Sequence, residues 1–357
     1  MRKKWKALLP AMAVIAFAAA GCGGDEGSGA SSDVSVGLVY DIGGRGDQSF
    51  NDAAAAGIER AAAELGITFT EASPNDDGSN RGELLQLGAD AHNLVIAVGF
   101  LFEGDAAKVG AANPETSFAV IDSSMIDWAQ DPPAPYGEKI AGLVFAEQQG
   151  SFLVGAAAAL KSTTGTVGFI GGVRGVGGLI EKFEAGYIAG AKAVNPDIKI
   201  LSEYITEAPN FDGFNAPDRA KDIALAMYEG GADIVYHAAG GSGAGLFEAA
   251  KTQSEASGAK VWGIGVDSDQ YNTVDPAVQE YVLTSMLKRV DVAVFEAVKA
   301  QIDGTLVGGE TRYDLAVDGV GYSTSGGFID DIAEKLEEFK AQIIDGTIVV
   351  PTDPTQA

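Results

Sequence analysis

The sequence predicts an α/β protein with two lobes, each built on a parallel sheet flanked by helices. Short apolar runs alternate with helical segments along nearly the whole chain, and this alternation is typical of parallel βαβ units. The pattern restarts after residue 161, so a second unit of similar size follows the first. A chain of 357 residues also exceeds what one hydrophobic core usually organises. Two packed cores are therefore expected.

The first unit begins with the strand 34–40, which is apolar and β-branched like a strand buried on both faces. Ser49 is the expected N-cap of the helix that follows, Asp52 stands at its third position, and an alanine-rich run continues it to Leu65. The further strands expected in this unit are 67–71, 93–100, 117–122 and 140–145, and the further helices are 80–92 and 103–112.

The second unit opens with an alanine-rich helix at 147–161 and ends with an amphipathic helix at 330–344. Between them the same alternation recurs, with an extended return at 312–320. The expected strands are 166–170, 198–205, 233–238, 260–266 and 281–288, and the expected helices are 180–194, 218–229, 245–255 and 290–302.

The loop between the first strand and the first helix is the strongest candidate for a binding site. Three glycines between positions 43 and 46 break the strand, and Asp41, Asp47, Phe50 and Asn51 follow at its carboxyl end. Open α/β sheets bind their ligands at this edge. An ordinary capped connecting loop is the alternative.

The N-terminus predicts export and a lipid anchor. A basic start precedes a short apolar core at 7–19, and small residues lead to Cys22, the only cysteine of the chain. This pattern resembles a bacterial lipoprotein signal, in which Cys22 becomes the lipidated first residue. The apolar core is shorter than the ~20 residues that span a bilayer. Residues 1–21 are thus the expected signal peptide and 22–32 a flexible tether.

Composition excludes several classes of function. The chain carries 24 basic and 50 acidic residues, a net charge of −26, so nucleic-acid binding is not expected. With Cys22 lipidated, no disulfide or cysteine nucleophile is available. The two histidines form no metal-ligand cluster, and Leu84 stands where a calcium loop at 74–80 would need a glutamate. Neither a metal nor a cofactor is expected.

Two glycine clusters, at 171–178 and 240–245, follow predicted strands and precede predicted helices. Neither matches the dinucleotide or P-loop fingerprint. Backbone N–H groups facing a ligand oxygen and simple tight turns remain alternatives. The second cluster is one residue away from a hydrolase nucleophile elbow at Ser242. Because both histidines, His92 and His237, precede Ser242, the usual order of that triad is absent.

Five blocks of sequence carry a resemblance to a known family. They are DIGGRGDQSFN (41–51), FEAGYIAGA (183–191), AGGSGAG (239–245), GVDSDQ (265–270) and TSMLKR (284–289). In this order they resemble the recurring blocks of the basic membrane protein family. That family comprises substrate-binding lipoproteins of ABC transporters, several of which bind purine nucleosides. The similarity runs from about residue 34 to the C-terminus.

The resemblance implies a type I periplasmic-binding-protein fold, in which three crossings and a hinge join two lobes around the ligand. By analogy, one lobe is 33–143 plus 268–308 and the other is 144–267 plus 309–357. The implied ligand-binding residues are Asp41, Phe50, Asn51, Asp122, Tyr236, His237, Gly241, Asp267 and Lys288. Phe50 would stack on a base, with Tyr236 where family members have a second phenylalanine, and Asp267 with Lys288 would bind ribose hydroxyls.

The expected function is therefore transport and not catalysis. The chain is expected to be a monomeric receptor, anchored through Cys22 on the extracytoplasmic face of the cell membrane. It would close on a nucleoside and present it to ABC permease subunits. A receptor for a sugar or other polar metabolite is one alternative, since the fold does not fix the ligand. A hydrolase or nucleoside-processing enzyme on the same scaffold is the other.

Overall fold

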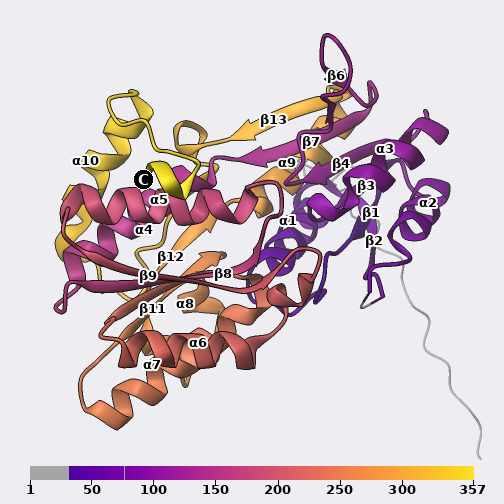
Figure 1. Ribbon diagram of the computed structural model, residues 1–357. Helices are drawn as coiled ribbons and strands as arrows, with labels where there is room; N and C mark the ends of the chain where they lie inside the picture. Colours follow the sequence, from indigo (N-terminus) through magenta and orange to yellow (C-terminus); the bar gives the residue numbers. More distant parts are fainter. Residues whose placement is uncertain (1–31, 76) are drawn as a thin grey trace, which may run out of the picture.

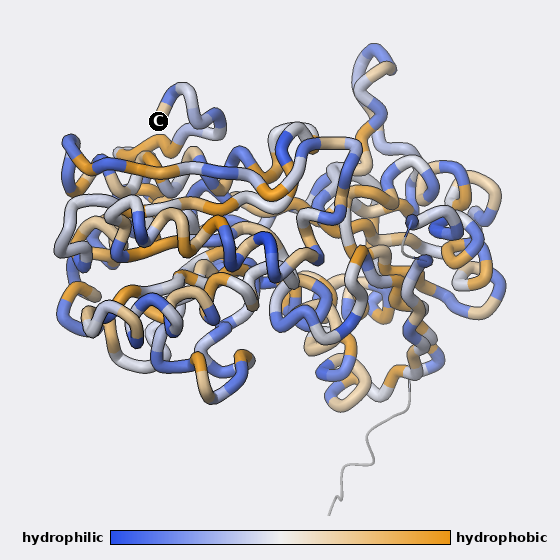
Figure 2. Tube along the Cα trace, turned by 60° about the horizontal axis from the view of Figure 1, so that its bottom comes forward, coloured by the Kyte–Doolittle hydropathy of each residue, from blue (hydrophilic) through white to orange (hydrophobic). Residues whose placement is uncertain are grey.

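The computed structural model describes residues 32–75 and 77–357, which form two α/β lobes side by side (Figure 1). The expected signal peptide, Cys22 and all of the tether except residue 32 lie outside the described residues. Hydrophobic segments gather inside each lobe, and hydrophilic ones predominate in the surrounding loops (Figure 2). In the described part of the chain, no helix is both long and apolar enough to cross a bilayer.

The first lobe contains a sheet in which every pairing is parallel, with the order β13-β7-β4-β3-β1-β2. Its strands are β1 (Ser35–Val39), β2 (Thr68–Ala72), β3 (Leu94–Ala97), β4 (Ser117–Ile121), β7 (Ile140–Phe145) and β13 (Gly309–Tyr313). Helices α1 (Phe50–Leu65) and α9 (Val290–Asp303) cover one face. Helices α2 (Arg81–Ala91) and α3 (Glu103–Ala112) cover the other. The central strands are buried on both faces, as their continuous apolar runs predict.

The second lobe contains a sheet of order β14-β12-β11-β10-β8-β9, in which β14 pairs antiparallel and the other strands parallel. Its strands are β8 (Thr166–Arg174), β9 (Lys199–Glu207), β10 (Ile234–Ala238), β11 (Trp262–Asp267), β12 (Val282–Lys288) and β14 (Val320–Tyr322). Helices α4 (Glu147–Lys161) and α5 (Leu179–Val194) pack together on one face. Helices α6 (Pro217–Glu229) and α7 (Gly243–Ser257) cover the other, and α10 (Ala333–Ile344) packs against α4. The expected α/β architecture with two cores is confirmed.

The lobe boundaries expected from the sequence differ from the observed strand pairing. The chain crosses between the sheets after β7, after β12 and after β13. Strand β12 therefore belongs to the second sheet, where it pairs with β11, and the crossing expected at residue 267 falls after Lys288 instead. Strand β13 pairs with β7 in the first sheet, whereas the expected boundaries place residues 309–313 in the second lobe. Strand pairing between distant segments, which local sequence does not encode, decides both assignments.

Strand β8 is longer than predicted, because the first glycine cluster does not end it at Ile170. Gly171 and Gly172 continue the strand, and a Cβ on either would lie 2.5 Å from an aromatic ring, that of Tyr204 or Phe214 respectively. These two glycines therefore make room for aromatic side chains on neighbouring segments. The turn comes later, at Gly175, Gly177 and Gly178, all of which have positive φ.

Candidate ligand-binding site

A cleft that is open to solvent lies between the two lobes. It is lined by the ends of strands and the loops that follow them: Asp41, Ile42, Asp47, Phe50, Asn51, Phe100 and Asp122 from the first lobe, and Leu179, Ile180, Phe183, Phe214, Ala238, Ala239, Gly240, Gly241, Val266, Asp267 and Lys288 from the second. This position, at the carboxyl ends of parallel strands, is where α/β sheets bind ligands.

The side chain of Asp47 caps the start of α1, although Ser49 occupies the N-cap position. The Asp47 carboxylate accepts hydrogen bonds from the backbone N–H groups of Ser49 at 3.0 Å, Asn51 at 2.8 Å and Asp52 at 3.1 Å. Its negative charge also suits the helix N-terminus. The Ser49 side chain makes no capping bond. Ser49 therefore stands at the predicted N-cap position, but its hydroxyl does not cap the helix and points instead toward the second lobe.

Asn51 lines the cleft, but its amide is engaged within the loop. Its Oδ1 accepts the backbone N–H of Asp41 at 3.0 Å, and its Nδ2 donates to Asp47 at 3.1 Å and to the carbonyl of Ile42 at 3.3 Å. The residue is only 2% exposed. Asn51 thus shapes the loop that carries Phe50, and it has little donor capacity left for a ligand.

Asp41 is a buried carboxylate at the end of β1 that faces the cleft. Its Oδ1 accepts the backbone N–H of Ile42 at 2.8 Å and lies 3.7 Å from the guanidinium of Arg81. Burial raises the pKa of Asp41 to about 6. A Cβ on Gly99 would lie 2.2 Å from Oδ2 of Asp41, so only glycine leaves room for this carboxylate. Asp41 is therefore held in place as an acceptor for N–H or O–H groups.

Lys288 is a buried cation that lines the cleft and bridges the two lobes. Its Nζ lies 2.6 Å from Oδ1 of Asp122, at the end of β4, and 3.7 Å from Oε1 of Glu147, at the start of α4. The side chain is 2% exposed. Burial by itself would lower the pKa of Lys288, but the carboxylates of Asp122, Glu147 and Asp267 together raise it. Lys288 therefore stays charged, and its charge is already offset by carboxylates.

Asp122 and Asp267 occupy matching positions in the two sheets, at the carboxyl ends of β4 and β11. Both have left-handed backbone conformations, with φ of 65° and 64°. For a residue other than glycine this costs ~1–3 kcal/mol, and such strain concentrates at functional sites. Burial raises the pKa of Asp267 to about 6, although Lys288 opposes the rise. Asp267 accepts a hydrogen bond from the Ser49 hydroxyl at 2.6 Å, across the lobes.

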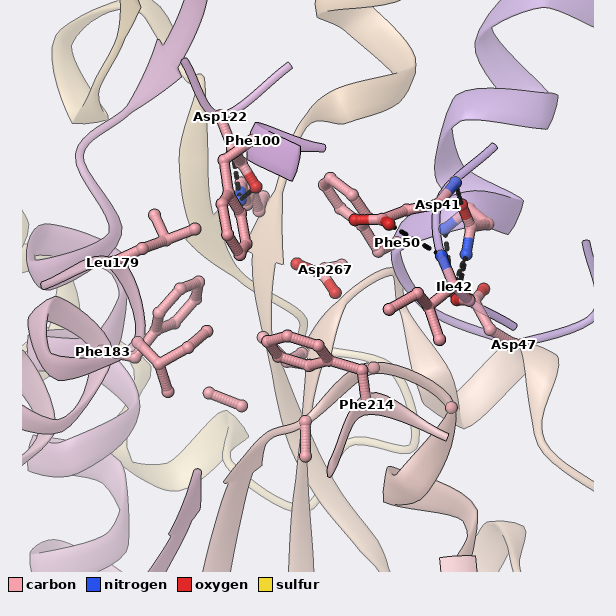
Figure 3. A pocket seen from close by; sticks show the side chains of 18 residues that line it. Asp41, Ile42, Asp47, Phe50, Phe100, Asp122, Leu179, Phe183, Phe214 and Asp267 are labelled. Atoms are coloured by element: carbon pink, nitrogen blue, oxygen red, sulfur yellow. Dashed lines mark hydrogen bonds and ion pairs between the residues drawn. The ribbon is translucent and has the colours of Figure 1, made fainter. Parts of the chain in front are cut away.

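Four phenylalanines form the apolar walls of the cleft. Phe50 and Phe100 reach into it from the first lobe and Phe183 and Phe214 from the second, with Asp267 near the middle (Figure 3). The Nζ of Lys288 lies 5.0 Å from the centre of the Phe50 ring. Sequence reasoning missed Phe100, Phe183 and Phe214 as wall residues. The sequence contains one indication of Phe214: two phenylalanines lie between the predicted strand 198–205 and the predicted helix 218–229. In the structure they belong to the 3₁₀ turn Phe211–Phe214.

The structure does not place Tyr236 or His237 at the cleft. Both are fully buried inside the second lobe. The Tyr236 hydroxyl lies 3.2 Å from the hydroxyl of Ser151, and its ring packs among other aromatic rings. Burial lowers the pKa of His237 to about 4. Both residues lie within β10, and only its last residue, Ala238, and the loop that follows reach the cleft.

The remaining expected residues converge on the cleft, although they come from five segments far apart in sequence. They are Asp41, Phe50, Asn51, Asp122, Gly241, Asp267 and Lys288. At Gly241 a Cβ would lie 3.5 Å from Cβ of Asp47 in the other lobe, so the two lobes approach each other closely here. Together these residues offer aromatic faces, hydrogen-bond acceptors and one paired cation.

Comparison with known proteins shows similarity over almost the whole described chain. Residues 34–354 match the family model Bmp, described as "ABC transporter substrate-binding protein PnrA-like". The chain is 33% identical to the CD4+ T-cell-stimulating antigen of Listeria innocua, over 99% of this chain and 100% of that protein. It is 32% identical to the ABC transporter nucleoside-binding protein BmpA of Lactococcus lactis, over 96% of this chain and 98% of that one. An ABC transporter solute-binding protein from Aeropyrum pernix K1 superimposes with a TM-score of 0.74 at 28% identity, covering 90% of this chain and 94% of that one.

Proposed function

The chain belongs to the Bmp family of PnrA-like ABC transporter substrate-binding proteins, and from this premise we propose that it binds a purine nucleoside between its lobes. The observation that carries the proposal is the pairing of two aromatic walls, Phe50 and Phe214, with the carboxylate of Asp267 between them. A relative of similar length is named as a nucleoside-binding protein. An aromatic base and a ribose with several hydroxyls together match this combination of surfaces.

Each part of a nucleoside finds a suitable partner in the cleft. Phe50 and Phe214 come from different lobes and can lie against the base, which has a π-face on each side. Asp41 accepts hydrogen bonds from the N–H groups at the edge of a base. Asp267 accepts bonds from ribose hydroxyls, and Lys288 donates one. Asn51 acts in this proposal by holding the loop that presents Phe50.

The mechanism we propose is closure of the lobes around the ligand. Three crossings connect the sheets, and the cleft is lined from both sides. A ligand that contacts Phe50 on one lobe and Phe214 on the other binds the closed arrangement better than an open one and therefore shifts the population toward it. The closed pair of lobes is the form that permease subunits would recognise. A lipid on Cys22 would keep the receptor at the extracytoplasmic face of the membrane.

A ligand screen by thermal unfolding tests this function. Nucleosides, free bases, nucleotides and sugars are compared at equal concentration, and those that raise the melting temperature are titrated calorimetrically. A ligand at 100 times its Kd stabilises the folded state by ~2.7 kcal/mol, which shifts the melting temperature by several degrees. Purine nucleosides should give the largest shifts. Stabilisation by sugars alone would replace the proposal with a sugar receptor, and conversion of a nucleoside to products would indicate an enzyme.

A further inference from the structure

Beside the cleft, side chains of the second lobe bond directly to the loop before α1 in the first lobe. We propose that Gln270, held in place by His237, latches the two lobes in the closed arrangement, and that His237 is thereby a positioning residue for ligand binding. The latch consists of the Gln48 carbonyl in the first lobe and the side chains of Gln270 and Thr273 in the second. This inference rests on the proposed function in one respect, namely that the lobes close in order to bind a ligand.

On the side of the first lobe, the latch depends on an unusual backbone conformation. Gln48 has a φ of 56°, in the left-handed region that residues other than glycine rarely adopt. Its carbonyl accepts hydrogen bonds from Nε2 of Gln270 at 3.1 Å and from Oγ1 of Thr273 at 3.3 Å. Both donors belong to the other lobe. These two hydrogen bonds stabilise the strained conformation of Gln48, and they form only when the lobes are in contact.

On the side of the second lobe, neighbouring groups fix the orientation of the Gln270 amide. Gln270 is 1% exposed and is the first residue of the short helix α8 (Gln270–Thr273). Its Oε1 accepts the backbone N–H of Val266 at 2.9 Å, and its own backbone N–H donates to Oγ of Ser285 at 3.0 Å. Because the oxygen must face the N–H of Val266, the nitrogen must face Gln48.

His237 completes this arrangement from within β10. Its Nε2 lies 2.8 Å from Oε1 of Gln270. Since Oε1 can only accept, Nε2 carries the hydrogen of the neutral ring, and Nδ1 is left without a hydrogen-bond partner among the described residues. A Cβ on Gly243 would lie 2.0 Å from Cε1 of His237, so the ring fits against the backbone at the start of α7. Burying Nδ1 without a hydrogen-bond partner costs free energy. The hydrogen bond from Nε2 to Gln270 explains why the ring is nevertheless held in this position.

The latch adjoins the residues that contact the proposed ligand. Gln48 directly precedes Ser49 and Phe50 in the sequence. The Ser49 hydroxyl donates to Asp267 at 2.6 Å, and the Ser49 carbonyl accepts the hydroxyl of Ser268 at 2.8 Å. Holding Gln48 against the second lobe therefore also fixes the Phe50 ring over the cleft. Closure and the presentation of the aromatic face are coupled through this one loop.

Variants of the second lobe separate the latch from the ligand site. Gln270→Leu removes both ends of the amide, and Thr273→Val removes the second donor from an exposed position where folding is not at risk. His237→Phe keeps a ring but no donor, whereas His237→Gln keeps a donor. Asn272→Ala is the matched control, because Asn272 lies on the same short helix and bonds only within its own lobe, to Asp269 and Ser325.

The first measurement is the distance between the lobes in the ligand-free protein. Spin labels on cysteines introduced at Glu83 of α2 and Asp222 of α6, both exposed, report this distance in a Cys22→Ser background. Gln270→Leu, Thr273→Val and His237→Phe should shift the distribution toward longer distances, while His237→Gln and Asn272→Ala should match the parent protein. Unchanged distributions in folded Gln270→Leu and Thr273→Val proteins would overturn the latch, whether or not any nucleoside binds.

The second measurement is the affinity for the nucleoside that the ligand screen selects. Loss of one net hydrogen bond from the closed state should weaken binding about fivefold. Most of the change should appear as faster dissociation, since the contacts with the ligand itself are intact. Recovery of slow dissociation in His237→Gln, but not in His237→Phe, would identify the donor as the feature that matters. Equal dissociation rates in both variants would overturn the role of His237.

Discussion

Replacing Phe214 by alanine should weaken nucleoside binding more than any other change to the second lobe's aromatic wall. Phe214 faces the cleft opposite Phe50, and the absence of a side chain at Gly172 leaves room for its ring. Stacking of an aromatic side chain on a base contributes ~1–3 kcal/mol. Phe214→Ala should therefore raise Kd by roughly 5- to 150-fold. Phe50→Ala should cost a similar amount, because the two rings would lie on opposite faces of one base.

Isothermal calorimetry with a single purine nucleoside measures these affinities, and thermal unfolding confirms that each variant is folded. Phe214→Tyr keeps the aromatic face and should bind almost normally. Phe295→Ala removes a half-buried phenylalanine of α9 that does not line the cleft and should not change Kd. The double variant Phe50→Ala/Phe214→Ala reports whether the two rings act on the same base. An unchanged Kd in a folded Phe214→Ala protein would refute the assignment of Phe214 as a stacking face.

Three further predictions concern the anchor, the ligand charge and pH. Cys22→Ser should release the protein from membranes into the soluble fraction without changing its melting temperature; a variant that stays with the membrane would contradict lipidation at this residue. A nucleoside 5′-monophosphate should bind at least tenfold more weakly than its nucleoside in side-by-side titrations (about 1.4 kcal/mol), since the cleft presents Asp41, Asp122 and Asp267 against one paired Lys288; equal affinities would count against this. Burial raises the pKa of Asp267 from 3.8 to about 6, so the charged form of this carboxyl destabilises the folded state. Protonation removes this destabilisation at low pH. As pH falls from 7 to 4, the unfolding free energy of the wild type should therefore rise by up to ~3 kcal/mol relative to that of Asp267→Asn. Denaturant titrations at several pH values measure that difference, and a constant value would show that the Asp267 carboxyl is not destabilised by burial.

Local sequence patterns determined the elements and the acidic residues at their ends. Strands β4, β7 and β11 end where an apolar run in the sequence ends. The sequence therefore already predicts that Asp122 and Asp267 lie at the carboxyl ends of β4 and β11. The bounds of α3 and α4 agree with the predicted 103–112 and 147–161. Such features depend on neighbouring residues and on hydrophobic periodicity, both of which are present in the sequence itself.

Contacts between distant segments decided everything that the sequence misplaced. The sheet to which β12 or β13 belongs depends on its hydrogen-bond partners, which lie far away along the chain. Ser49 has the residue type of a helix cap, but it bonds to Asp267, more than two hundred residues away along the chain, while Asp47 caps the helix. No local pattern distinguishes these two outcomes, because a serine hydroxyl can either accept a helix N–H or donate to a carboxylate.

The second aromatic wall is the clearest case in which only the tertiary structure could decide. The family resemblance implied Tyr236 as the second wall, but the Tyr236 side chain lies in the core of the second lobe, where its ring packs against Phe169. Phe214 reaches the cleft from a 3₁₀ turn that follows a different strand, β9. The side of the sheet that a ring occupies follows from strand alternation, but whether it meets a cleft depends on where the other lobe lies. The sequence by itself determined the chemistry at the ends of the strands, and the packing of one lobe against the other determined which side chains face the cleft.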